Sequence, residues 1–197
     1  SIRYTTEIRV RGINMELNDI EETKENQRWN STEGYIQKRD VEEGDVVLDV
    51  GSYPGEFAIY AAKKGAEKVV AVEGDADNIE KMEKNLRRNN VRDKVEIIPE
   101  VLWKHEEGVS FDRDGFTSSV SEDGREHPTT TLSQLEGRFG CFDFIKMDIE
   151  GSELEVIDSY NGVCESFVAI ASYHERDNEK TCHFLEEILR NSETGYK

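Results

Sequence analysis

The chain has 197 residues, with 43 acidic residues against 25 lysines and arginines and a formal net charge of −18. This excess of acid disfavours nucleic acids and anionic membranes as partners, because lysine and arginine supply most of the affinity for phosphate groups. A solubilising surface of the kind found in salt-adapted organisms is the alternative explanation. The length suits one α/β domain, no window approaches the ~18 apolar residues of a membrane span, and residues 1–20 lack the apolar segment of a secretory signal.

The amino-terminal residues predict a β-hairpin, because polar and apolar residues alternate on either side of a turn within residues 1–20. The residues that follow are polar and charged, with Trp29 and Tyr35 as the expected anchors. We therefore expect an extension over residues 1–43, made of the hairpin and a polar segment, before a second unit over residues 44–197.

An apolar run at residues 46–50 predicts a buried parallel strand, because such strands are covered on both faces. A glycine-rich turn follows it and leads into an expected helix, and such a turn forms a cofactor pocket at the carboxyl end of the strand. Asp49 stands where a dinucleotide turn needs glycine, and a carboxylate there repels phosphate but suits a cationic ligand. An ordinary turn without a ligand is the alternative. The candidate cofactor-binding residues are Asp49, Gly51, Ser52, Tyr53 and Gly55.

A second apolar strand ends in Glu73, 24 residues after Asp49. In nucleotide-binding folds an acid at this place accepts hydrogen bonds from ribose hydroxyls. Glu73 and the following Gly74 are therefore further cofactor-binding candidates. A loop acid exposed to solvent is the alternative.

The strand predicted at residues 142–148 ends in Asp148, and Glu150 follows shortly after. Because the carboxyl ends of the strands in an open α/β sheet face one crevice, we expect these two acids beside Asp49 and Glu73. The predicted architecture is a Rossmann-like, doubly wound and mostly parallel sheet with helices on both faces.

The other elements follow from apolar periodicity and from cap residues. Ser152 and Glu155 fit a capping box at the start of a helix, and residues 104–140 are expected to be irregular apart from a short strand at 129–131. Strands are predicted over residues 46–50, 68–73, 95–98, 142–148 and 167–172. Helices are predicted over residues 56–64, 76–90, 152–160 and 178–190.

Five stretches of the chain form a recognisable combination: Asp49-Val-Gly-Ser-Tyr-Pro-Gly55, Glu73, Asn85 to Asn89, Thr131-Leu132, and Ile145-Lys-Met-Asp-Ile-Glu-Gly-Ser-Glu153. The combination resembles the FkbM-type methyltransferases over residues 44–160, and its last block is the most specific part. These are class I enzymes that depend on S-adenosylmethionine, and several are associated with O-methylation of natural products and sugars. Two positions depart from the family pattern, which often has asparagine in place of Tyr53 and proline in place of Gly74.

The resemblance implies further features of the cofactor site. The adenine of S-adenosylmethionine is expected in a slot near Glu100 and Val101, after the strand at residues 95–98. The amino-terminal extension is expected to cover the cofactor, by analogy with other methyltransferases. Class I methyltransferases usually end in a further hairpin, and the chain stops at Lys197 where that hairpin should begin, so we expect it to be absent or truncated.

Methyl transfer to an alcohol needs a base that takes the proton of the acceptor. Asp148 is the first candidate and is also expected to contact the cofactor, Glu150 is the second, and His174 is the third because it follows the strand at residues 167–172. A helix-capping role for Glu150 and a loop position for His174 are the alternatives. The same three side chains could hold a divalent cation, although their spacing does not require one.

The sequence therefore predicts a cytoplasmic, S-adenosylmethionine-dependent methyltransferase that acts on a hydroxyl of a small molecule or sugar, with neither a nucleic acid nor a membrane as partner. The alternatives are a non-catalytic protein that binds S-adenosylmethionine or a partner, and an RNA or protein methyltransferase. Cys141, Cys164 and Cys182 are widely spaced and lack a Cys-x-x-Cys pair, so we expect no disulfide and no zinc site, as in a reducing cytoplasm.

Overall fold

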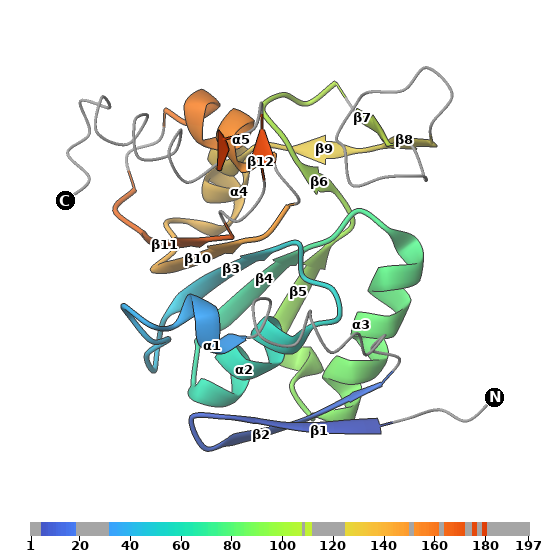
Figure 1. Cartoon of the computed structure of the whole chain (residues 1–197), viewed down its shortest axis with the longest axis vertical. Coiled ribbons are helices and arrows are strands. Elements are labelled where there is room, and N and C mark those ends of the chain that lie inside the picture. Colours follow the sequence, from blue (N-terminus) through green and yellow to red (C-terminus); the bar gives the residue numbers. More distant parts are fainter. Residues whose placement is uncertain are drawn as a thin grey trace.

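A five-stranded parallel sheet forms the centre of the computed structural model, in the order β11-β10-β3-β4-β5 (Figure 1). The structure describes residues 5–18, 32–107, 109–111, 125–149, 152–161, 164–171, 175–176 and 179–180. The strands are β3 (Val46–Val50), β4 (Lys68–Val72), β5 (Val95–Ile98), β10 (Phe144–Met147) and β11 (Phe167–Ile170). The predicted α/β fold with a mostly parallel sheet is confirmed.

Helices cover both faces of this sheet (Figure 1). On one face lie α2 (Glu56–Lys64) and α3 (Ala76–Arg88), and on the other lie α4 (Leu132–Phe139) and α5 (Glu153–Ser159). Successive side chains of a strand point to opposite faces of the sheet. Val47 therefore packs in the hydrophobic core on the side of α2 and α3, and Leu48 packs in the core on the side of α4 and α5. The bounds of β3, α2 and β5 are those that the sequence predicts.

The predicted amino-terminal hairpin is also present, as β1 (Thr5–Val10) and β2 (Ile13–Asn18) in antiparallel register. Strand β2 contacts α2 and α3, and its buried residues Met15 and Leu17 belong to the hydrophobic core on that side of the sheet. Asn89 fixes the hairpin further, because its side chain accepts a hydrogen bond from the Glu16 amide (3.1 Å) and donates one to the Glu16 carbonyl (2.7 Å).

Two predictions about helix starts are wrong. Helix α4 was expected to be irregular chain, yet Thr131 and Gln134 form a complete capping box at its start. Conversely, Ser152 precedes α5 but its side chain makes no capping hydrogen bond. Its backbone has φ −88° and ψ 1°, whereas a capping serine needs an extended backbone to reach the helix amides.

The prediction of no disulfide is wrong as well, since Cys141 and Cys164 are bonded, with their Cα atoms 5.4 Å apart. Cys141 lies just before β10 and Cys164 just before β11. These strands are parallel neighbours, so the residues that enter them are brought together although 23 positions separate them in the sequence. Disulfides persist in oxidising compartments, so the cysteines no longer support the expected cytoplasm.

The remaining elements are short. Residues 179–180, expected in a helix, pair with residues 175–176 instead, and the rest of that predicted helix lies outside the described residues. Within the described ranges, no helix has both the length and the apolar composition needed to cross a bilayer. These short elements are α1 (Thr32–Tyr35), a 3-10 helix (Arg92–Lys94), β6 (Val101–Leu102), β7 (Val109–Phe111), β8 (Arg125–His127), β9 (Thr129–Thr130), β12 (Glu175–Arg176) and β13 (Glu179–Lys180).

Candidate active site

The candidate site lies at the carboxyl ends of β3, β4 and β10. The chain leaves β3 into α2 on one face and leaves β10 toward α5 on the other, so a crevice is expected between these two strand ends. Gly51, Glu73 and Asp148 each follow the last residue of one of these strands. The fold therefore brings together the three strand ends that the sequence singled out.

Gly51 and Asp148 are in close contact where β3 and β10 end. Gly51 has φ 71°, in the left-handed region that favours glycine, and a Cβ atom there would collide with the backbone oxygen of Asp148. The Gly51 amide donates to the Val72 carbonyl at 3.1 Å, and the Asp148 amide donates to the Val50 carbonyl at 3.1 Å. Only glycine fits this position without moving the end of β10.

Beneath this glycine lies a buried ion pair. The Lys146 Nζ atom is 3.1 Å from Asp49 Oδ1, and it also donates to the carbonyl oxygens of Gly51 (2.7 Å) and Val50 (3.2 Å). Burial raises the pKa of Asp49, and the Lys146 charge opposes that shift. Lys146 thus fixes the loop that Asp49 introduces, a role that the sequence reasoning missed because it treated the lysine only as part of a motif.

Asp49 lies in the interior of the protein rather than at the surface of the loop. Its carboxylate is fully buried and already has a cation beside it, so direct contact with a cationic ligand stays a prediction. Ser52 is buried too, and its hydroxyl donates to the Asp49 carbonyl at 2.6 Å. The Asn85 side chain donates to the Pro54 carbonyl at 3.0 Å, next to the cis bond between Tyr53 and Pro54.

Glu73 lies half-buried at the end of β4 and accepts a hydrogen bond from the Asp75 amide at 2.9 Å. Asp75 in turn caps α3, because its carboxylate accepts from the amides of Asp77 (2.9 Å) and Asn78 (3.0 Å). Burial raises the pKa of Glu73, and the Asp75 amide and the Asn78 side chain oppose that shift. A carboxylate held in this way is an acceptor suited to ribose hydroxyls.

The two residues expected beside the adenine differ in their surroundings. The Glu100 carboxylate lies 3.5 Å from the Arg138 guanidinium of α4. Val101 lies on β6, its amide donates to the Pro128 carbonyl at 2.8 Å, and its side chain packs against Gly74. Val101 therefore borders the loop after β4, whereas the Glu100 carboxylate has an ionic partner in α4.

Asp148 contacts a residue from the amino-terminal extension. The Tyr35 hydroxyl donates to Asp148 Oδ2 at 2.7 Å, and the Lys146 Nζ atom lies 5.5 Å from the centre of the Tyr35 ring. The ring also packs edge-on against Phe57 of α2, and the Thr32 amide donates to the Glu56 carboxylate at 2.9 Å. The sequence predicted Tyr35 only as an anchor, because nothing in the sequence relates it to a residue 113 positions away.

Glu150 and His174 lie outside the described residues, so their proposed roles stay predictions, as does the anchoring role of Trp29. Among the side chains that are described, no cluster of three His, Cys, Asp or Glu residues could hold a metal ion. That part of the chain therefore gives the divalent cation no support.

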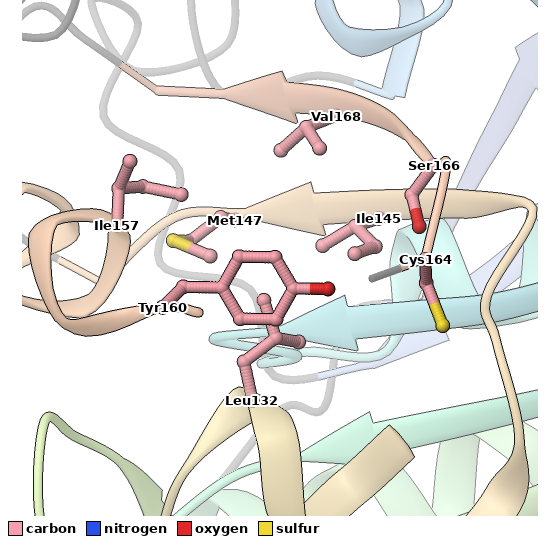
Figure 2. A pocket seen from close by; sticks show the side chains of 8 residues that line it. All are labelled: Leu132, Ile145, Met147, Ile157, Tyr160, Cys164, Ser166 and Val168. Carbon is pink, nitrogen blue, oxygen red and sulfur yellow. The ribbon is translucent and has the colours of Figure 1, made fainter. Parts of the chain in front are cut away.

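A pocket on the opposite side of β10 does not belong to this site (Figure 2). It lies between β10 and β11 and the helices α4 and α5, and the side chains of Ile145 and Met147 point into it. Lys146, between these two in the strand, points to the other face. The lining residues are Leu132, Ile145, Met147, Ile157, Tyr160, Cys164, Ser166 and Val168.

Comparison with known proteins agrees with this fold. Residues 49–197 match the family model of the methyltransferase FkbM domain, about three quarters of the chain. The chain belongs to the FkbM methyltransferase family. The solved methyltransferase FkbM from Methylobacillus flagellatus KT aligns with a TM-score of 0.53 and 21% identity, over 77% of this chain and 38% of that one. This FkbM chain and that structure therefore share a fold.

Curated relatives of this FkbM chain match it over a shorter stretch. The ribosomal protein L11 methyltransferase of Thermotoga maritima is 46% identical over 57 residues, which is 29% of this chain and 22% of that protein. The corresponding protein of Desulforamulus reducens is 42% identical over 65 residues, or 33% of this chain and 20% of that protein. The chain thus spans about a fifth of the length of these relatives.

Proposed function

We propose that this chain transfers the methyl group of S-adenosylmethionine to a hydroxyl group of a small molecule or sugar. The observation that carries the proposal is the place of Asp148, which lies half-buried at the end of β10 and against Gly51, where the Tyr35 hydroxyl donates to its Oδ2 atom at 2.7 Å. A carboxylate held in one orientation at this strand end can take the proton of an alcohol that comes within hydrogen-bond reach of it.

The residues at the strand ends fit S-adenosylmethionine. The turn from Gly51 to Gly55 lets the backbone approach a ligand closely, and Glu73 offers its carboxylate to the ribose hydroxyls. Val101 and Gly74 border the expected adenine slot. When bound, the cofactor supplies a methyl group already activated by its sulfonium.

The protein then has to orient the acceptor and take its proton. Methyl transfer is an in-line displacement, in which the acceptor oxygen bonds to the methyl carbon while the carbon–sulfur bond breaks, so positioning supplies much of the rate. We infer that Asp148 receives the proton from the acceptor hydroxyl and that Tyr35 fixes the direction of its carboxylate. Glu150 and His174 remain the second and third candidates for the base.

A protein acceptor is the second candidate, because the curated relatives are methyltransferases of ribosomal protein L11. Their short match, 57 and 65 residues, makes it the weaker of the two. RNA is disfavoured by the net charge of −18. A non-catalytic protein that binds S-adenosylmethionine or a partner is a further alternative, which turnover would exclude.

The test begins with calorimetric titration of the purified chain with S-adenosylmethionine, S-adenosylhomocysteine and NAD, where we expect the first two alone to bind. Tritiated S-adenosylmethionine is then offered with monosaccharides, phenols, ribosomal protein L11 or total RNA. Label in a hydroxylated small molecule supports the proposal, and its transfer to L11 or RNA alone would overturn it. Asp148→Asn is expected to bind S-adenosylhomocysteine within about threefold of the wild type, yet to lose at least about 100-fold in turnover.

A further inference from the structure

The loop after β4 is held by a histidine from a distant part of the chain. The Nδ1 atom of His127 lies 3.0 Å from the backbone oxygen of Gly74, across a sequence separation of 53 residues. A carbonyl only accepts hydrogen bonds, so Nδ1 carries the proton in this contact. Gly74 directly follows Glu73, the residue assigned to the ribose, and neither the glycine turn nor the fold class explains this contact.

Gly74 has no side chain with which to fix its own position. A Cβ atom there would collide with the side chain of Val101, so in this chain the absence of a side chain at position 74 lets Val101 pack against the loop. Glycine gives a chain more conformational freedom than any other residue, and this freedom must be lost when the loop is ordered. Contacts from neighbouring segments therefore have to hold the loop.

The segment that carries His127 is itself firmly placed. Directly after it, the Pro128 carbonyl accepts from the Val101 amide at 2.8 Å, and the Thr130 carbonyl accepts from the Trp103 amide at 2.9 Å. Residues 129–130 form β9, which pairs in parallel with β6. His127 is thus followed directly by residues whose carbonyls are hydrogen-bonded to β6 and to the residue after it, beside the loop that follows β4.

The residues on either side of Gly74 are held as well, Glu73 by the last residue of β5 and Asp75 by the Glu73 carboxylate. The Glu73 amide donates to the Ile98 carbonyl at 3.1 Å, and its carboxylate accepts from the Asp75 amide at 2.9 Å. In the sequence, the Gly74 carbonyl lies between the Glu73 and Asp75 amides. The His127 imidazole holds this carbonyl with a further hydrogen bond.

We propose that His127 is a positioning residue for the cofactor, which holds the Gly74 carbonyl and so fixes Glu73 in the orientation that receives the ribose hydroxyls. This role rests on the proposed function, because it assumes that Glu73 contacts the cofactor. It assigns a binding task to the chain between β6 and α4, a stretch whose sequence carries no motif for it.

The test uses S-adenosylhomocysteine as the probe, so that no methyl acceptor is needed. His127→Leu removes the donor, and we expect calorimetry to give about five- to tenfold weaker binding, the size of one lost hydrogen bond. His127→Asn can place its amide N–H near the position of Nδ1 and should bind within about twofold of the wild type. His127→Ala gives the same comparison as leucine if the larger apolar side chain disturbs folding.

A matched control separates this role from a general loss of stability. Tyr160→Phe also removes one side-chain hydrogen bond, to Glu136 at 2.6 Å, but on the side of β10 away from the crevice. It should lower the midpoint of thermal unfolding without changing the affinity for S-adenosylhomocysteine. A similar loss of affinity in Tyr160→Phe would show that the effect of His127 is only structural and would overturn the proposal.

A double-mutant cycle with Glu73→Ala tests the route of the effect. If His127 acts through Glu73, His127→Leu should change the affinity by less than about twofold once Glu73 is alanine. Equal losses in both backgrounds, or wild-type affinity in His127→Leu, would overturn the proposal. A wild-type chain that binds neither S-adenosylmethionine nor S-adenosylhomocysteine would instead overturn the cofactor site itself, and this role of His127 with it.

Discussion

Lys146 and Asp49 are partners across two neighbouring strands of the sheet, paired in register on β10 and β3 with 3.1 Å between Nζ and Oδ1. Both residues are buried, at 5% and 0% exposure, so neither charge can be stabilised by water. Because the same ammonium holds the Gly51 carbonyl at 2.7 Å, the pair connects the interior of the sheet to the glycine-rich loop after β3.

We expect Lys146→Met to lower the free energy of unfolding by about 3–5 kcal/mol, because it leaves the Asp49 carboxylate buried without its cation. Urea denaturation followed by circular dichroism measures the change. The double variant Asp49→Asn/Lys146→Met carries no charge at either position and should recover part of the loss. Equal stability of Lys146→Met and the wild type would contradict this account of the pair.

Tyr35→Phe is expected to slow methyl transfer to a hydroxylated acceptor by about tenfold, because it removes a hydrogen bond to a charged group. The ring stays over Lys146 and against Phe57, so the affinity for S-adenosylhomocysteine should stay within about twofold. The measurement is kcat and KM for the acceptor beside calorimetry with S-adenosylhomocysteine.

Tyr60→Phe is the matched control for that variant, since the Tyr60 hydroxyl donates to Asp40 at 2.8 Å, away from the strand ends. It should leave kcat unchanged. An unchanged kcat in Tyr35→Phe, or a fall of the same size in both variants, would count against a positioning role for Tyr35.

Glu73→Gln should make the chain more stable at neutral pH. Burial raises the pKa of Glu73 in the folded state, so the folded chain holds the proton more tightly than the unfolded chain. The protonated Glu73 carboxyl therefore favours the folded state. This contribution is fully present below the pKa of Glu73 in the unfolded chain and is lost as the pH rises through its pKa in the folded chain. The gain of Glu73→Gln over the wild type should therefore disappear as the pH falls below about 4.

Thermal unfolding of both chains at several pH values measures this gain, and the variant should also bind S-adenosylhomocysteine more weakly. Glu67→Gln removes one charge at an exposed site and serves as the control. Lower stability of Glu73→Gln at pH 7 would show that Glu73 serves the fold rather than the ligand.

Loss of the bond between Cys141 and Cys164 should lower the free energy of unfolding by about 3 kcal/mol, the value expected when a disulfide closes a loop of this length. Cys141→Ser/Cys164→Ser and the wild type in a reducing agent should unfold at the same urea concentration. Cys182→Ser should match the oxidised wild type. If the reducing agent left the wild type unchanged, the disulfide would not form in solution.

Local sequence patterns predicted the structure of those segments whose conformation depends mainly on residues that are close in the sequence. The apolar run at residues 46–50 and the helix that follows fold as predicted, since burial on both faces needs continuous apolar residues. The capping box at Ser152 was wrong because the backbone of Ser152, with φ −88° and ψ 1°, is not in the extended conformation that a capping side chain needs.

The sequence by itself determined the class of fold and the family, because strand and turn chemistry repeat along the chain in the order that builds a parallel sheet. Only the tertiary structure decided which side chains meet: Tyr35 with Asp148, His127 with Gly74, Asp49 with Lys146, and Cys141 with Cys164. These contacts span 23 to 113 residues, and such distances are closed by the packing of helices and strands rather than by any local preference. The motifs therefore indicated only the strand ends of the candidate site, and folding brought the other side chains to them.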